Sequence, residues 1–124
     1  MKTILASIIA SFFASAAADE LTGRWESSPS VNGNVTGVVF KEDNTFEGYI
    51  NKKPFVSGTY SYSGEDSVFT FQDNGCNGAT GVYKILFFSN SDSLRFIPLE
   101  DGCDQRREGM QKLTMGRAKQ LQPF

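Results

Sequence analysis

The charged residues that could bind a ligand lie close together near the C-terminal end of the chain. Glu100 and Asp101 come just before Arg106 and Arg107. If this segment folds back, Arg106 would lie at the mouth of the fold and bind a ligand carboxylate through two parallel hydrogen bonds. The alternative is a solvent-exposed turn in which these charges pair with one another and contribute little to stability.

Histidine is absent from the sequence. Its absence excludes nucleophiles activated by histidine and removes the commonest metal ligand. Asp73, Asp101 and Asp104 could offer oxygen atoms to calcium, but their spacing matches no calcium-binding loop. We therefore predict no catalytic residue, no metal and no cofactor. An enzyme would have to rely on tyrosine, carboxylate, lysine or arginine groups.

The two cysteines, Cys76 and Cys103, both lie in turn sequences rich in glycine, aspartate and asparagine. Two cysteines in a secreted chain are expected to pair, so we predict a structural disulfide. The alternative, a reactive thiol, lacks a histidine and a Cys-x-x-Cys spacing.

Residues 1–18 have the layout of a secretory signal peptide, with Lys2, an apolar stretch and a run of small residues. The apolar stretch is shorter than the ~20 residues that span a bilayer, so we predict no membrane span. The prediction is a secreted protein, extracellular or periplasmic, with one domain over residues 19–124. Asn34 begins an Asn-x-Thr sequon, which could be glycosylated in a eukaryote.

The charge balance is slightly acidic, with 12 basic and 14 acidic residues. Binding of nucleic acids or of anionic membranes requires a basic face. We therefore predict no nucleic-acid partner.

The rest of the chain consists of short segments rich in Val, Thr, Tyr and Phe, separated by Gly, Asn, Asp and Ser. We predict eight strands, at residues 21–27, 36–42, 46–51, 55–62, 67–72, 80–88, 93–99 and 111–119. Residues 104–110 could form a helical turn before the last strand. Eight antiparallel strands in meander order can close into a barrel without free edges. In that order the loops that hold Cys76 and Cys103 lie at the same end.

Alternation along the strands predicts which side chains point into the barrel. A barrel of this size is either filled by side chains or holds one small ligand. Tyrosine hydroxyls inside it need partners, which suggests a polar network or a wet cavity. The predicted ligand-binding residues are the inward-facing Phe40, Tyr60, Tyr62, Phe71, Tyr83 and Phe96, together with Arg106. Four apolar residues are predicted to face outward and could bind a protein partner, namely Val39, Val82, Leu86 and Phe88.

The first and last strands resemble those of the calycins, the superfamily of lipocalin-like barrels. The matching residues are Gly23 and Trp25 on the first strand and Arg117 on the last. The resemblance implies that Arg117 stacks on Trp25 and closes one end of the barrel. The sequence around Trp25 also resembles the opening of avidin-type biotin binders. The tryptophans that line their biotin site are missing here, because Trp25 is the only tryptophan.

These observations leave three classes of function open. The leading hypothesis is a lipocalin-like protein that binds a small apolar or amphipathic molecule inside the barrel. The second is a secreted protein-interaction module, an inhibitor or effector with a solid core. The third is a barrel isomerase that uses tyrosine and carboxylate groups.

Overall fold

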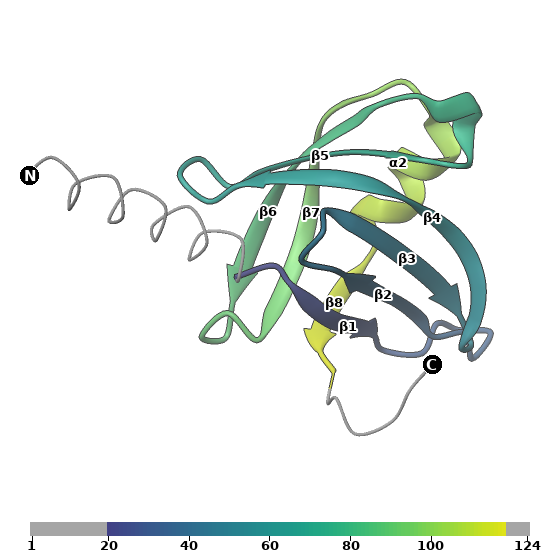
Figure 1. The fold of residues 1–124 in the computed structure, drawn as a ribbon. Helices are drawn as coiled ribbons and strands as arrows, with labels where there is room; N and C mark the ends of the chain where they lie inside the picture. Colours follow the sequence, from purple (N-terminus) through teal and green to yellow (C-terminus); the bar gives the residue numbers. More distant parts are fainter. Residues whose placement is uncertain (1–19, 119–124) are drawn as a thin grey trace, which may run out of the picture.

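The fold is an eight-stranded antiparallel β-barrel, seen in a computed structural model that describes residues 20–118. Each strand pairs with its neighbours in the sequence, and the last strand pairs with the first (Figure 1). The predicted closed meander is confirmed. The predicted signal peptide and its cleavage site lie outside the described residues. The strands are β1 (Gly23–Ser27), β2 (Thr36–Phe40), β3 (Thr45–Ile50), β4 (Lys53–Ser63), β5 (Val68–Asp73), β6 (Gly81–Phe88), β7 (Ser93–Asp101) and β8 (Thr114–Arg117).

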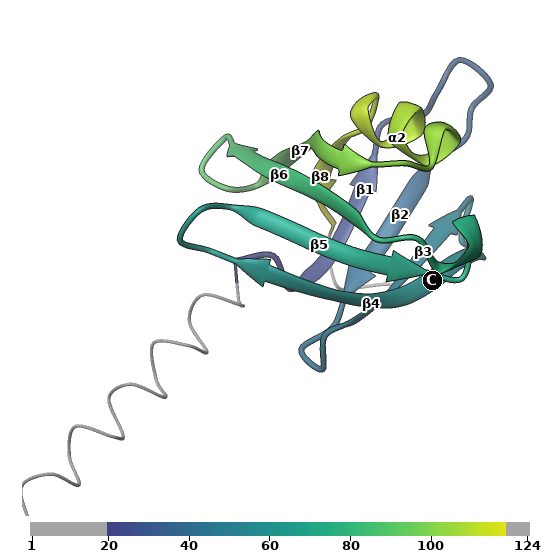
Figure 2. The same ribbon diagram turned by 90° about the horizontal axis from the view of Figure 1, so that it is seen from above.

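Two short helical elements join the strands at one end of the barrel. The 3-10 helix η1 (Cys76–Gly78) connects β5 to β6, and α2 (Asp104–Gln111) connects β7 to β8. Figure 2 shows α2 at the same end as the loop between β1 and β2. Because the helix continues to Gln111, the last strand begins at Thr114 and is shorter than the sequence predicted. The acidic Asp104 in the first turn suits the positive end of the helix dipole.

The core is built from side chains on the face that alternation predicts to point inward. It is largely aromatic, and the rings meet at tilted, edge-on or stacked angles. This packing fills the end of the barrel at which Trp25 lies. The buried core residues are Leu21, Trp25, Phe40, Phe46, Tyr60, Phe69, Phe71, Tyr83, Ile85, Leu94, Phe96 and Met115.

Trp25 and Arg117 close one end of the barrel. They are direct partners across the β1–β8 pairing, and the Arg117 guanidinium carbon lies 4.2 Å from the centre of the Trp25 ring. Trp25 is fully buried, and its Nε1 donates a hydrogen bond to the Leu21 carbonyl at 3.0 Å. Arg117 also donates to the carbonyls of Glu20 and Thr22. Gly23 has φ 128°, a conformation that only glycine adopts readily.

The disulfide between Cys76 and Cys103 ties the opposite end together. It links η1 to the residue before α2, so the β5–β6 and β7–β8 connections are held side by side. The predicted bridge is confirmed. It forms the edge of the cavity described below.

Candidate functional site

A cavity of about 590 Å³ occupies the disulfide end of the barrel. The beginning of β2, the end of β3 and helix α2 all contribute to its wall. The exposed residues Phe55, Asn74 and Gln105 also line it, so it reaches the surface there. The barrel is therefore packed at the Trp25 end and hollow at the other.

Aromatic rings form the inner part of this cavity. Phe69 and Phe71 are stacked, with ring centres 5.0 Å apart, and Phe40 meets Phe69 edge-on at 5.4 Å. This surface suits an apolar ligand, because binding would remove it from water. The apolar side chains that line the inner part are Phe40, Phe46, Phe69, Phe71, Phe96 and Met115.

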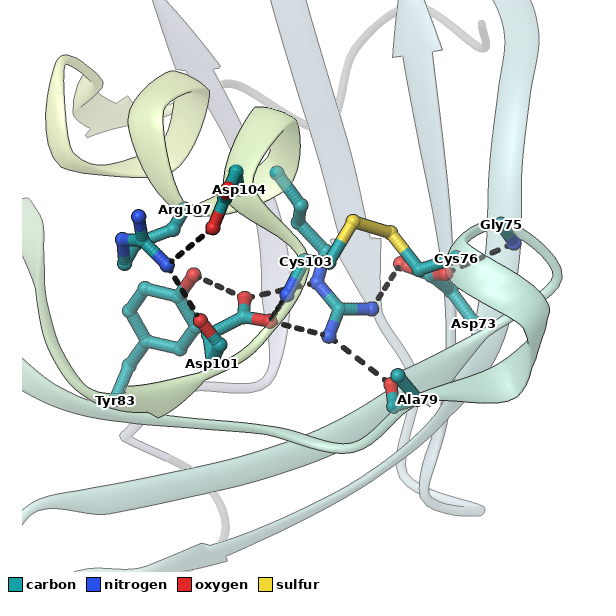
Figure 3. Close-up of a disulfide and its surroundings, with 10 residues drawn as sticks. Asp73, Gly75, Cys76, Ala79, Tyr83, Asp101, Cys103, Asp104 and Arg107 are labelled. Carbon is teal, nitrogen blue, oxygen red and sulfur yellow. Dashed lines mark hydrogen bonds and ion pairs between the residues drawn. A yellow bond between two sulfur atoms is a disulfide. The ribbon is translucent and has the colours of Figure 1, made fainter.

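A buried ion pair stands at the wall beside the disulfide. The Asp101 carboxylate accepts hydrogen bonds from Arg106 Nε at 2.9 Å and from Arg106 Nη2 at 2.8 Å. It also accepts from the Cys103 N–H at 3.0 Å and from the Tyr83 hydroxyl (Figure 3). Arg106 Nη2 donates to the Ala79 carbonyl as well. The two Arg106 bonds fix α2 against the end of β7, the Tyr83 bond joins β6 to the same carboxylate, and the Ala79 bond holds the segment before β6.

Asp73, at the end of β5, adds a second carboxylate to the same arginine. Asp73 Oδ2 lies 3.4 Å from Arg106 Nη1, and Asp73 Oδ1 accepts a hydrogen bond from the Gly75 N–H at 2.9 Å. Nη1 is buried and makes no hydrogen bond within the described part of the chain. The guanidinium carbon lies 4.7 Å from the centre of the Phe71 ring. One guanidinium therefore stands between two carboxylates and against an aromatic face.

Burial and hydrogen bonding act in opposite directions on the pKa of Asp101. Burial alone would raise it, but hydrogen bonds from Arg106, Tyr83 and the Cys103 N–H outweigh burial and lower the pKa to about 2. Burial and the bond to Asp101 raise the pKa of the Tyr83 hydroxyl. The bond to Asp101 also raises the pKa of Arg106. At neutral pH the pair is ionised and Tyr83 keeps its proton.

Gly81, the first residue of β6, makes room for the ion pair. A Cβ atom at this position would lie 2.9 Å from the Phe71 ring. It would also lie 3.2 Å from Arg106 Nη2 and from Asp101 Oδ2. Any larger residue at position 81 would therefore press on these three side chains.

The structure brings together four of the seven predicted ligand-binding residues at the cavity, namely Phe40, Phe71, Phe96 and Arg106. The three tyrosines lie elsewhere. The Tyr60 hydroxyl donates to the Lys41 carbonyl at 2.8 Å, and Tyr62 packs edge-on against Phe87 near the closed end. Tyr83 is fully buried under the ion pair. Tyr60 and Tyr62 thus belong to the packed end of the barrel, whereas Tyr83 lies behind the cavity wall, against Phe71 and Phe96.

Arg106 combines features of both interpretations of the charged segment. It lies at the cavity, but it is buried and already paired, with only 9% of its side chain exposed. A ligand carboxylate would have to compete with Asp101 for Nε and Nη2. Of the three aspartates considered for calcium, Asp73 and Asp101 face this arginine, and Asp104 pairs with Arg107 at 3.0 Å. Asn34, the sequon residue, is exposed and accepts a hydrogen bond from Asn51.

Several cavity residues were not singled out from the sequence. Phe46 and Phe69 line the cavity but were not among the predicted binding residues. Asp73 was considered only as a calcium ligand. The contribution of α2 could have been predicted from the sequence, because Arg106 and Met110 are four residues apart, lie on one face of a helix and both line the cavity.

An apolar surface also lies on the outside of β6 and β7. Leu86 and Phe88 on β6 are 48% and 39% exposed, and Ile97 and Leu99 on β7 are 42% and 54% exposed. Leu86 and Ile97 are close because Leu86 pairs with Arg95, two residues before Ile97. Leu86 and Phe88 thus face outward, as predicted, beside two apolar residues that the prediction did not include.

Comparisons of the sequence with protein-family models and with curated proteins find no match. Within residues 20–118, no helix has the length and apolar character needed to cross a membrane.

Proposed function

We propose that this protein is a secreted, lipocalin-like carrier that binds one small apolar or amphipathic molecule in the barrel cavity. The observation that carries the proposal is the aromatic cavity of about 590 Å³. Its volume falls within the roughly 300–1,000 Å³ that is typical of small-molecule sites. The eight-stranded meander, the Trp25–Arg117 contact and the disulfide support the calycin resemblance and a secreted location.

The cavity can be tested with a neutral, apolar fluorescent probe such as N-phenyl-1-naphthylamine. We expect its fluorescence to rise on binding and to saturate at one probe per chain. A Val38→Trp variant should weaken binding, because Val38 lines the cavity and tryptophan would occupy part of it. Val39→Trp is the matched control, since Val39 is the next residue of β2 and points to the other face. A probe that binds both variants equally well, or no binding to the wild type, would contradict the proposal.

A protein-interaction module is the second candidate, and the exposed residues Leu86, Phe88, Ile97 and Leu99 favour it. Apolar side chains that gather on one face of a barrel are a common feature of binding surfaces. A Leu86→Lys/Ile97→Lys variant would test it. Under this candidate the double variant loses capture of a partner from the native secreted fluid, while probe binding in the cavity is unchanged. An unchanged set of captured proteins would count against it.

The isomerase hypothesis would require a buried carboxylate that meets a tyrosine hydroxyl in the cavity. Tyr83 and Asp101 do meet, but neither lines the cavity. The lowered pKa of Asp101 makes it a weak base, and the raised pKa of Tyr83 makes it a weak acid. We therefore propose a structural role for this pair.

A further inference from the structure

We propose that the cavity prefers an apolar molecule that ends in a protonated amine, and that Asp73 receives the amine. The inference rests on the proposed function and names the ligand class of the same cavity. It starts from the charges at the cavity wall. Two carboxylates, Asp73 and Asp101, share one guanidinium, Arg106. The three groups together carry one excess negative charge.

The two carboxylates are not equally paired. Asp101 takes the guanidinium fork with two hydrogen bonds of 2.8 and 2.9 Å. Asp73 has only the longer 3.4 Å approach to Nη1, which is not a hydrogen bond. The excess negative charge is therefore centred on Asp73, the carboxylate that lines the cavity.

Asp73 has room to accept further hydrogen bonds. An ionised carboxylate has about four lone-pair sites. In the described structure Oδ1 accepts one bond, from the Gly75 N–H, and Oδ2 faces Nη1 without accepting one. The side chain is only 6% exposed, so salt screens its charge weakly. A ligand ammonium would supply both the missing donor and the missing positive charge.

The aromatic wall supports the same ligand class. Rings attract cations over their faces, and the cavity is lined largely by phenylalanine. Arg106 lies over Phe71, so this wall already holds one cation against an aromatic face. The apolar tail of the ligand would then extend toward Phe40, Phe69 and Phe96.

A ligand carboxylate would find neither a free arginine donor nor a favourable charge at this wall. Asp101 occupies Nε and Nη2 of Arg106, and Nη1 is buried against Asp73. A third carboxylate would bring a like charge near two others at low effective dielectric. An alcohol carries a donor but no charge. The expected order of affinity is therefore amine, then alcohol, then carboxylate.

Three ligands that share one alkyl chain and differ in the head group test this order, namely decylamine, decanol and decanoate. Each is used to displace N-phenyl-1-naphthylamine from the wild-type protein at neutral pH. We expect decylamine to bind at least about tenfold more tightly than decanoate, with decanol between them. If the probe does not bind at all, the cavity proposal fails. If the probe binds but decanoate displaces it as well as decylamine does, the cavity proposal stands and the amine preference is overturned.

The Asp73→Asn variant assigns the preference to one residue. Asparagine keeps the shape and the oxygen that accepts the Gly75 bond but removes the charge. We expect the ratio of decylamine to decanoate affinity to fall about tenfold, while decanol affinity changes little. Asp66→Asn, an exposed carboxylate in the β4–β5 turn at the far end, is the matched control and should leave the ratio unchanged. An equal fall in both variants, or none in Asp73→Asn, would overturn the assignment. If Asp73→Asn does not fold, the order of the three ligand affinities in the wild-type protein still tests the amine preference.

Discussion

Acidification is expected to destabilise the barrel through Asp101. Its pKa is lowered from 3.8 to about 2 in the folded protein, so the ionised form is favoured by folding. The stabilisation is present above the pKa of the unfolded chain and is lost as the pH falls through the folded value. One pKa unit corresponds to about 1.4 kcal/mol, so about 2 kcal/mol should disappear between pH 5 and pH 2.

The measurement is the free energy of unfolding by urea, for the wild type and for Asp101→Asn, at several pH values in this range. Because both proteins share all other carboxylates, the difference between them reports on Asp101 alone. At pH 5 the variant should be less stable by about 3–5 kcal/mol, because Arg106 loses its charged partner in a buried position. The difference in the free energy of unfolding should then narrow by about 2 kcal/mol as the pH falls to 2. Asp66→Asn controls for the loss of a carboxylate on the surface. A difference that is constant with pH would refute the claim that the ion pair holds Asp101 ionised.

Three further predictions concern the two ends of the barrel. Trp25→Ala should cost about 3–5 kcal/mol of unfolding free energy, because it removes the largest fully buried side chain; wild-type-like thermal stability would exclude a closing role. Replacing Cys76 and Cys103 by serine should cost roughly 3–4 kcal/mol, measured by urea denaturation against the wild type, and an equal cost from reducing the wild type would confirm the cause. Gly81→Ala should cost about 1–3 kcal/mol in the same assay, since its Cβ would press on the Phe71 ring and on the ion pair; an unchanged midpoint would mean that these groups yield easily.

Much of the fold could be predicted because it depends on local patterns. Alternation along each strand is set by the geometry of extended backbone, so the side chains that became the core were already on one predicted face. Closure followed from the strand number and the meander order, and both cysteines fell into connections at one end. The start of β8 was misplaced because the boundary between α2 and β8 depends on how the helix packs.

The candidate site was only partly predictable. Inward direction alone does not say at which depth a side chain lies, so Tyr60, Tyr62 and Tyr83 were grouped with the phenylalanines that line the cavity. Depth depends on strand tilt and register, which arise when all eight strands close.

The sequence by itself determined the strands and their inner faces, because the alternation of extended backbone settles these features. It also predicted the disulfide, from the two cysteines of a secreted chain, and the closing pair Trp25 and Arg117, from the resemblance to the calycins. Only the tertiary structure decided where the barrel is hollow and how its charges are shared. Asp73, Asp101 and Arg106 come from β5, β7 and α2, and the closure of the barrel and the disulfide bring the two carboxylates to 3.4 and 2.8 Å from the Arg106 guanidinium. That spacing is a consequence of packing between distant segments, and it leaves Asp73 as the less fully paired acid at the wall of an aromatic cavity.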